Sequence, residues 1–172
     1  MSFHKERDDH LCLHEPFGEA WYQGEDRRCP PQHAGELKLG LTATTVWSDL
    51  RANAAAGPVF IKEFPHYVSH LIDDNFLDHF NHSFLIRDPA LTLPSMYDKW
   101  PDFELSETGF AEQRSLFDRL TKRWGKPPPV IDAEDLICDL GQRRLQALAM
   151  TVHTDPELKT AVWREPCHRK LV

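Results

Sequence analysis

The sequence predicts a three-layer α/β/α domain, in which helices cover both faces of a mainly parallel sheet. Four short apolar runs alternate with segments of helical pattern, which is typical of this fold class. The runs are short and continuous, as expected for strands that are buried on both faces. A chain of 172 residues suits one domain with one core, so we treat residues 1–172 as a single unit.

The four apolar runs predict four strands. His14-Glu15-Pro16 ends the first of them, and three consecutive prolines precede the fourth. The third leads directly into Arg87-Asp88-Pro89. In chain order the predicted strands are Leu11–Leu13, Pro58–Phe64, Ser83–Ile86 and Val130–Asp132.

Helical patterns fill most of the remaining chain. Gly57 and Gly125 follow two of these segments directly and provide C-terminal stops. The predicted helices are Thr42–Ala56, Val68–Phe80, Glu107–Trp124 and Gly141–His153, and a further one begins at Pro89. Ala20–Leu41 is instead rich in charged residues, Gly and Pro, so residues 20–41 predict a long loop or lid.

Composition and charge exclude several classes of function. The formal net charge of −7 gives no overall attraction to nucleic acid. No run approaches the roughly 20 apolar residues that cross a bilayer, and the charged N-terminal residues lack the apolar core of a secretory signal. The four cysteines contain no CxxC pair, which argues against a zinc site and a disulfide framework. We therefore expect a cytoplasmic protein with no nucleic-acid or membrane partner.

The third predicted strand delivers Arg87 to its carboxyl end, where ligands of open α/β sheets bind. Pro89 suits the first turn of the helix that follows, and Ser95 lies about two helical turns into that helix. A guanidinium at this place can form paired hydrogen bonds with phosphate oxygens, and a hydroxyl can add another. Arg87 and Ser95 are therefore candidate phosphate ligands, although an Arg after a strand is more often a surface ion-pair partner.

This strand-Arg-Asp-Pro pattern, with Ser at the same spacing, resembles the 3′-phosphate-binding element of sulfotransferases that use 3′-phosphoadenosine 5′-phosphosulfate. Other segments resemble a microbial and fungal branch of the P-loop sulfotransferase superfamily in the same order, from Asp8 to Met150. The resemblance implies that Arg87 and Ser95 hold the donor's 3′-phosphate. It also implies sulfuryl transfer to the hydroxyl or amine of a small-molecule acceptor. These further segments are His14-Glu15-Pro16-Phe17, Phe60-Ile61-Lys62-Glu63, Glu107-Thr108-Gly109 and Val130–Leu136.

One part of the family pattern is missing. No GxxxxGK[ST] loop occurs in the chain, and Met1–Asp9 contain no glycine. Compared with the family, the chain starts one βα unit late, as an N-terminally truncated P-loop NTPase-like sulfotransferase fold. The resemblance then implies a sheet without its central strand, whose exposed edges favour a homo-oligomer. It also implies that the sulfuryl end of the donor lacks its main anion-binding loop.

Candidate catalytic groups lie at the end of the second predicted strand, in the segment Lys62-Glu63-Phe64-Pro65-His66. Sulfuryl transfer needs a base for the acceptor's proton and a cation for the bridging oxygen. Lys62 matches the cation of the family by position, and both Glu63 and His66 are candidates for the base. The alternative is that these residues form an ordinary solvated turn.

Candidate acceptor-binding residues follow the first predicted strand. His14 and Glu15 lie at its carboxyl end and are expected either to contact the substrate or to form a turn with Pro16. Trp21 and Tyr22 are candidates for an apolar wall.

We expect no metal site. His66 and His70 have the i, i+4 spacing of a ligand pair, and Asp74 follows them, but nothing completes a ligand set. Two alternatives to sulfuryl transfer also stay open. One is a degenerate, non-catalytic binding or scaffold protein, and the other is a family fold recruited to different small-molecule biosynthetic chemistry.

Overall fold

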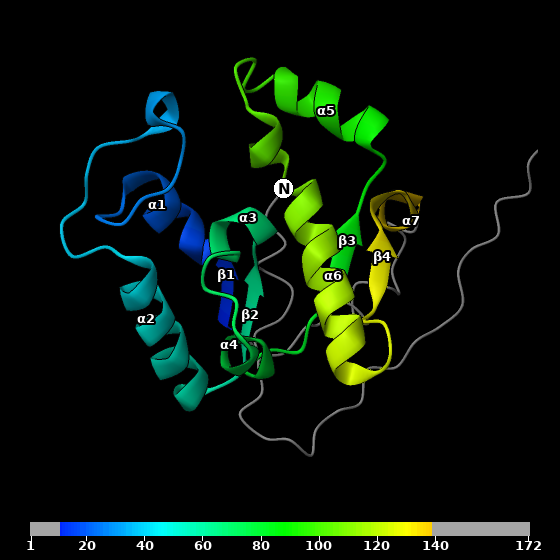
Figure 1. Cartoon of the computed structure of the whole chain (residues 1–172), viewed down its shortest axis with the longest axis horizontal. Helices are drawn as coiled ribbons and strands as arrows, with labels where there is room; N and C mark the ends of the chain where they lie inside the picture. Colours follow the sequence, from blue (N-terminus) through cyan, green and yellow to red (C-terminus); the bar gives the residue numbers. More distant parts are fainter. Residues whose placement is uncertain (1–10, 139–172) are drawn as a thin grey trace, which may run out of the picture.

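The structure is a computed structural model that describes residues 11–138 (Figure 1). It is a mixed α/β fold in which all four predicted strands form, each within a few residues of its predicted bounds. The strands pair in parallel, as predicted, but as two separate two-stranded sheets. The successive strands β2 and β3 are not hydrogen-bonded to each other. The strands are β1 (Leu11–His14), β2 (Val59–Lys62), β3 (Phe84–Ile86) and β4 (Val130–Asp132).

Seven α-helices and two short 3-10 helices connect and follow these strands in the described part of the chain. Their order alternates with the strands as the sequence predicted. The α-helices are α1 (Pro16–Gln23), α2 (Ala43–Ala56), α3 (Pro65–Val68), α4 (Asp74–Asp78), α5 (Pro89–Tyr97), α6 (Phe110–Trp124) and α7 (Ala133–Cys138), and the 3-10 helices are η2 (Pro31–His33) and η3 (Leu105–Thr108). None of the described helices is both long enough and apolar enough to span a membrane.

The predicted continuous helix Val68–Phe80 is wrong, because two short helices, α3 and α4, replace it. The cause is Asp73, whose Oδ1 accepts a hydrogen bond from the Phe76 backbone N–H at 2.7 Å. Aspartate is among the best N-capping residues, so it starts a new helix where the apolar periodicity alone would continue the old one.

Helix α1 was not predicted. It includes residues 20–23 of the expected loop, so that the loop begins only after Gln23. The rest of the loop is bound to the end of α1, since the backbone N–H groups of Arg28, Gly35 and Lys38 donate to α1 carbonyls. A helix leaves its last carbonyls without internal partners, and here the loop supplies those partners.

Helix α6 starts later than predicted, at Phe110, because Gly109 adopts a left-handed conformation (φ 68°) between η3 and α6. Its end at Gly125, also with φ 68°, is as predicted. The predicted helix Gly141–His153 lies outside the described residues.

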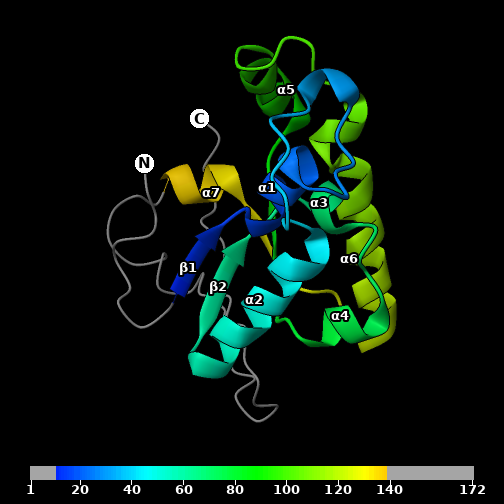
Figure 2. The ribbon, with the colours of Figure 1, turned by 90° about the vertical axis from the view of Figure 1, so that its left-hand side faces the viewer.

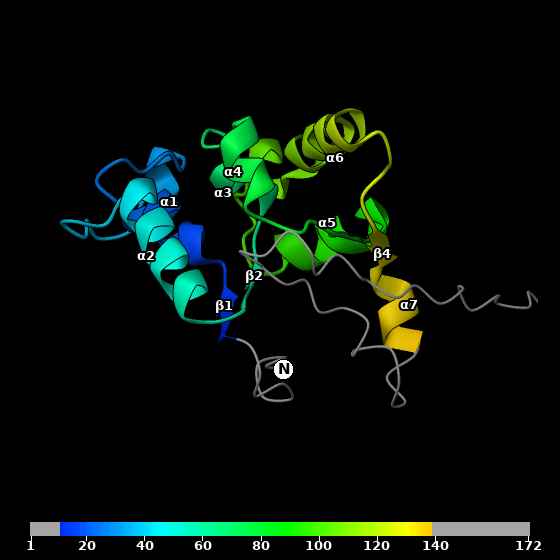
Figure 3. The same cartoon turned by 90° about the horizontal axis from the view of Figure 1, so that it is seen from below.

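Two apolar clusters hold the described elements together. The first joins α1, α2, β2, α3 and α4 around Phe17, Val59 and Phe76. The second joins α4, β3 and α6 through Leu77, Phe84 and Leu120. Viewed from the side and from below, α2, α4 and α6 lie on one side of the strands and α7 on the other (Figures 2 and 3). The side chains of Leu85 and Ile86 are 50% and 41% exposed, so a complete third layer is not formed by residues 11–138.

We predict that Leu120→Ala lowers the free energy of unfolding by about 2–5 kcal/mol. The Leu120 side chain is 0% exposed, so its truncation leaves a cavity in the core. Urea denaturation measures the change. Leu39→Ala is the control, since this side chain is 82% exposed and its loss changes stability by less than about 0.5 kcal/mol. Equal effects of the two substitutions would contradict the assigned core.

Candidate functional site

The carboxyl ends of β1 and β2 lie side by side, because His14 is in register with Lys62. Helix α1 begins directly after β1, and α3 begins shortly after β2. Two helices therefore start at the same edge of the sheet, which is where α/β folds place their ligands.

Glu63 connects the starts of these two helices. Its Oε2 accepts a hydrogen bond from the Phe17 N–H in the first turn of α1 at 2.9 Å. Its Oε1 accepts one from the Phe64 N–H, just before α3, at 3.0 Å. Glu15, the residue that precedes α1, has φ 52° and makes no side-chain cap of its own. Glu63 therefore serves as the missing N-terminal acceptor of α1.

Burial raises the pKa of Glu63 to about 7, and the two backbone hydrogen bonds oppose only part of that rise. Both oxygens of this carboxylate are engaged by backbone groups. The geometry thus assigns Glu63 a structural role.

Lys62 is paired with Glu15, another residue that the sequence singled out. The Lys62 ammonium forms a salt bridge with Glu15 Oε1 and lies 3.7 Å from the centre of the Phe64 ring. His14 Nε2 is 3.6 Å from the same Glu15 oxygen. The structure therefore brings three predicted residues together, but it neutralises the charge of Lys62 within the group.

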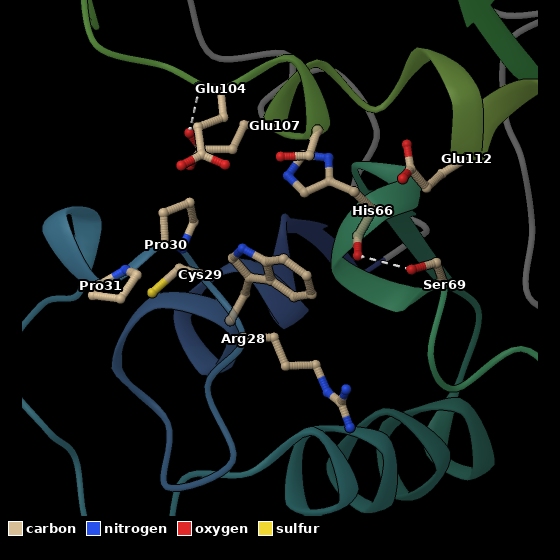
Figure 4. Close-up of a pocket in the computed structure, with 11 residues that line it drawn as sticks. Arg28, Cys29, Pro30, Pro31, His66, Ser69, Glu104, Glu107 and Glu112 are labelled. Atoms are coloured by element: carbon tan, nitrogen blue, oxygen red, sulfur yellow. Dashed lines mark hydrogen bonds between the residues drawn. The ribbon is translucent and has the colours of Figure 1, made fainter.

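A cleft of about 410 Å³ opens next to this edge, between α1, the loop that follows it, α3, η3 and the start of α6 (Figure 4). Two predicted residues, Trp21 and His66, line it. The volume lies within the range of roughly 300–1,000 Å³ that is usual for small-molecule sites. The eleven residues of the lining are Trp21, Arg28, Cys29, Pro30, Pro31, His66, Ser69, Glu104, Ser106, Glu107 and Glu112.

His66 is the most unusual residue of the cleft. Its side chain is buried, with 4% exposed, and neither ring nitrogen has a hydrogen-bond partner in the described part of the chain. Trp21 Nε1 is likewise buried without a partner. Buried polar atoms almost always have partners. Both residues line the cleft, so a ligand that reaches these nitrogens would supply the missing hydrogen bonds.

Aromatic rings and a glycine hold His66 in position. The Trp21 and Tyr67 rings lie 5.6 Å and 4.3 Å from the His66 ring, centre to centre, both edge to face. A Cβ on Gly109 would come within 2.9 Å of His66 Nδ1, so only glycine allows this approach. Burial lowers the pKa of His66, which favours a neutral ring with one N–H donor and one acceptor nitrogen.

Glu107 is a buried carboxylate that the sequence did not identify as a site residue. Its Oε1 lies 2.9 Å from His33 Nδ1 and 3.5 Å from the Tyr22 hydroxyl, which donates to it. Its Oε2 accepts from the Glu104 N–H at 2.9 Å. The pKa of His33 is raised by hydrogen bonds to Glu107 and then to Asp102. Tyr22 therefore contacts the site only through Glu107, since it is not among the residues that line the cleft.

The two candidate phosphate ligands, Arg87 and Ser95, lie outside the lining of the cleft. Arg87 stands at the carboxyl end of β3, as predicted, with its Nε 4.0 Å from Glu134 Oε1. Ser95 is exposed on α5, as expected from Pro89, and the Asp88 side chain accepts from the Ala90 N–H at 2.8 Å to cap this helix. Within residues 11–138 no hydrogen bond joins Arg87 to Ser95, and neither residue lines the cleft.

Two further histidines, His79 and His82, contact backbone carbonyls. His79 Nδ1 lies 2.6 Å from the Asn75 carbonyl oxygen, and His82 Nε2 lies 3.0 Å from that of Leu77. Among the described residues, no group of three or more side chains is arranged to hold a metal ion.

No family model, curated protein or solved structure matches this chain. The resemblance to sulfotransferases therefore stays a prediction. Chemically, the cleft offers carboxylates, the buried imidazole of His66 and the indole of Trp21 to a small molecule.

The raised pKa of Glu63 predicts a specific pH dependence of stability. The folded pKa of about 7 lies above the ordinary value of 4.5, so the folded state binds the proton more tightly. The stability that this group contributes is complete below pH 4.5 and is lost as the pH rises through 7. We expect the stability of the native chain relative to Glu63→Gln to fall by about 3 kcal/mol over that interval.

Urea denaturation of both proteins at several pH values measures this difference, which is independent of any constant effect of the glutamine. Glu19→Gln is the matched control, since that side chain is 53% exposed. A difference between the native chain and Glu63→Gln that does not change with pH would refute the burial of this carboxylate.

Proposed function

We propose that the protein is a sulfotransferase-like small-molecule transferase whose acceptor binds in the His66 cleft. The donor would be 3′-phosphoadenosine 5′-phosphosulfate. The observation that carries the proposal is the buried His66 ring, which borders the cleft with both nitrogens unpaired. It follows β2, the strand whose end resembles the catalytic segment of that family.

His66 is the better candidate for the base. Both oxygens of Glu63 accept backbone hydrogen bonds, whereas the nitrogens of His66 are unpaired. In the proposed reaction, the acceptor's oxygen or nitrogen forms a bond to sulfur while the bond from sulfur to the donor's phosphate oxygen breaks. The acceptor's proton passes to His66, and adenosine 3′,5′-bisphosphate leaves.

Arg87 is the proposed ligand of the donor's 3′-phosphate. Its side chain and that of Glu134 are 39% and 42% exposed, and an exposed ion pair contributes only about 0–1 kcal/mol. A doubly charged phosphate can therefore displace Glu134 from the guanidinium. Ser95 would add a hydroxyl from α5 once the phosphate has bound.

A non-catalytic binding protein is the second candidate. The observation that favours it is the engagement of Lys62 by Glu15 and by the Phe64 ring, which leaves the expected catalytic cation neutralised. In this case ligands would bind to the cleft without turnover.

Calorimetry with adenosine 3′,5′-bisphosphate tests the proposal. We expect Arg87→Ala to weaken binding roughly 10- to 100-fold, as the loss of a charged hydrogen-bond donor to phosphate implies. Arg114→Ala is the control, because this side chain is 75% exposed and pairs only locally with Asp118 on α6. If the native chain does not bind the nucleotide, or if both variants bind it equally well, the sulfotransferase proposal fails.

A further inference from the structure

We infer that the His66 cleft selects a small organic cation with an apolar body, such as a primary amine. The inference rests on the proposed function in one respect, which is that the amine is the acceptor. The binding preference itself follows from the cleft. It depends on the charges of the lining, on Trp21 and on the unpaired nitrogens of His66.

The cleft carries an excess of negative charge. Of its eleven lining residues, Glu104, Glu107 and Glu112 bear carboxylates and Arg28 bears the one permanent positive charge. In Figure 4 the guanidinium of Arg28 points away from the carboxylates. The pKa of His70 is lowered mainly by burial and further by the positive charge of Arg28.

Two of the three carboxylates already have protein partners. Glu107 is bonded to His33 and to the backbone N–H of Glu104, while Glu104 accepts a hydrogen bond from Gln32 at 3.1 Å. Glu112 differs from both, since no hydrogen bond or ion pair engages its side chain in the described part of the chain. It lies in the first turn of α6 and lines the cleft next to His66 (Figure 4).

His66 is the independent sign of a ligand. A side chain that is only 4% exposed, with both nitrogens unpaired, is expected to have its partner in the adjoining cleft. A neutral imidazole can accept a hydrogen bond from an ammonium N–H. An ammonium group between Glu112 and His66 would therefore satisfy an unpaired carboxylate and an unpaired ring nitrogen together.

The remaining walls suit the body of an organic cation. Trp21, Pro30 and Pro31 provide apolar surface in the same cleft. The face of an indole attracts cations as well as apolar groups. An inorganic cation would leave these walls unused, so the lining fits an amine with an apolar body.

Calorimetry with three probes of similar shape tests this inference on the full chain without nucleotide. Phenethylamine carries a positive charge, 2-phenylethanol is neutral, and phenylacetate is negative. We expect phenethylamine to bind at least about tenfold more tightly than the other two. Equal or tighter binding of the alcohol or the anion, or no binding of the amine at millimolar concentration, overturns the inference.

Two substitutions test which residues recognise the charge and the apolar body of the amine. Glu112→Gln should remove the advantage of the amine over the alcohol, whereas the control Glu19→Gln should keep it, because Glu19 is not among the lining residues. Trp21→Leu should weaken both probes. An unchanged preference in Glu112→Gln contradicts the role of this carboxylate, and the comparison of probes on the native chain tests the inference even if a variant does not fold.

The outcome is separable from that of the proposed function. Loss of nucleotide binding, with the amine preference retained, would reject sulfuryl transfer and leave a cation-binding protein. Nucleotide binding without any amine preference would reject the inference alone.

Discussion

The candidate site depends on the carboxylate of Glu63. It accepts hydrogen bonds from the N–H groups of Phe17 and Phe64 and so fixes the starts of α1 and α3 against each other. These two helices carry Trp21 and His66, whose rings form adjoining walls of the cleft. A carboxylate buried in this way opposes folding when it is ionised. Glu63 thus aligns two walls of the site, although its ionised form lowers the stability of the protein at high pH.

The other walls come from segments distant in sequence. The loop after α1 is bonded to the carbonyls of α1, and this places His33 against Glu107, which lies 74 residues further along the chain. Gly109 lets the end of η3 approach His66 without a clash. Each contact depends on a backbone conformation or a buried charge that the fold brings to the cleft. The site is therefore specified largely by tertiary structure.

The sequence predicted local structure where a local cause dominates. All four strands form, and α5 and the end of α6 follow from Pro89 and Gly125, whose effects act within one turn. The break at Asp73 could have been predicted from its capping side chain, but the apolar periodicity masked it. Helix α1 could not have been predicted in this way, because its N-terminal acceptor is Glu63, which is distant in sequence and follows β2.

The candidate site was predicted in part, for the same reason. Lys62 ends β2, and Glu63 and His66 follow it. The parallel pairing of β1 with β2 brings Glu15 to Lys62. The sequence left the choice of base open, since only the hydrogen bonds of Glu63 and the burial of His66 distinguish the two. Glu112 and Glu107 were missed because a carboxylate near a helix start is usually solvated. The predicted three-layer fold is not confirmed, because the strands form two separate sheets and β2 does not pair with β3 among the described residues.

The most direct test of this account is the ¹⁵N NMR signal of the His66 ring nitrogens at neutral pH, assigned with the variant His66→Gln. The account predicts a neutral ring in the free protein and a saturable shift of these nitrogens as phenethylamine is added. A ring that is already doubly protonated, or one whose signals stay fixed while the amine saturates the protein, would show that the cleft around His66 is not a ligand site.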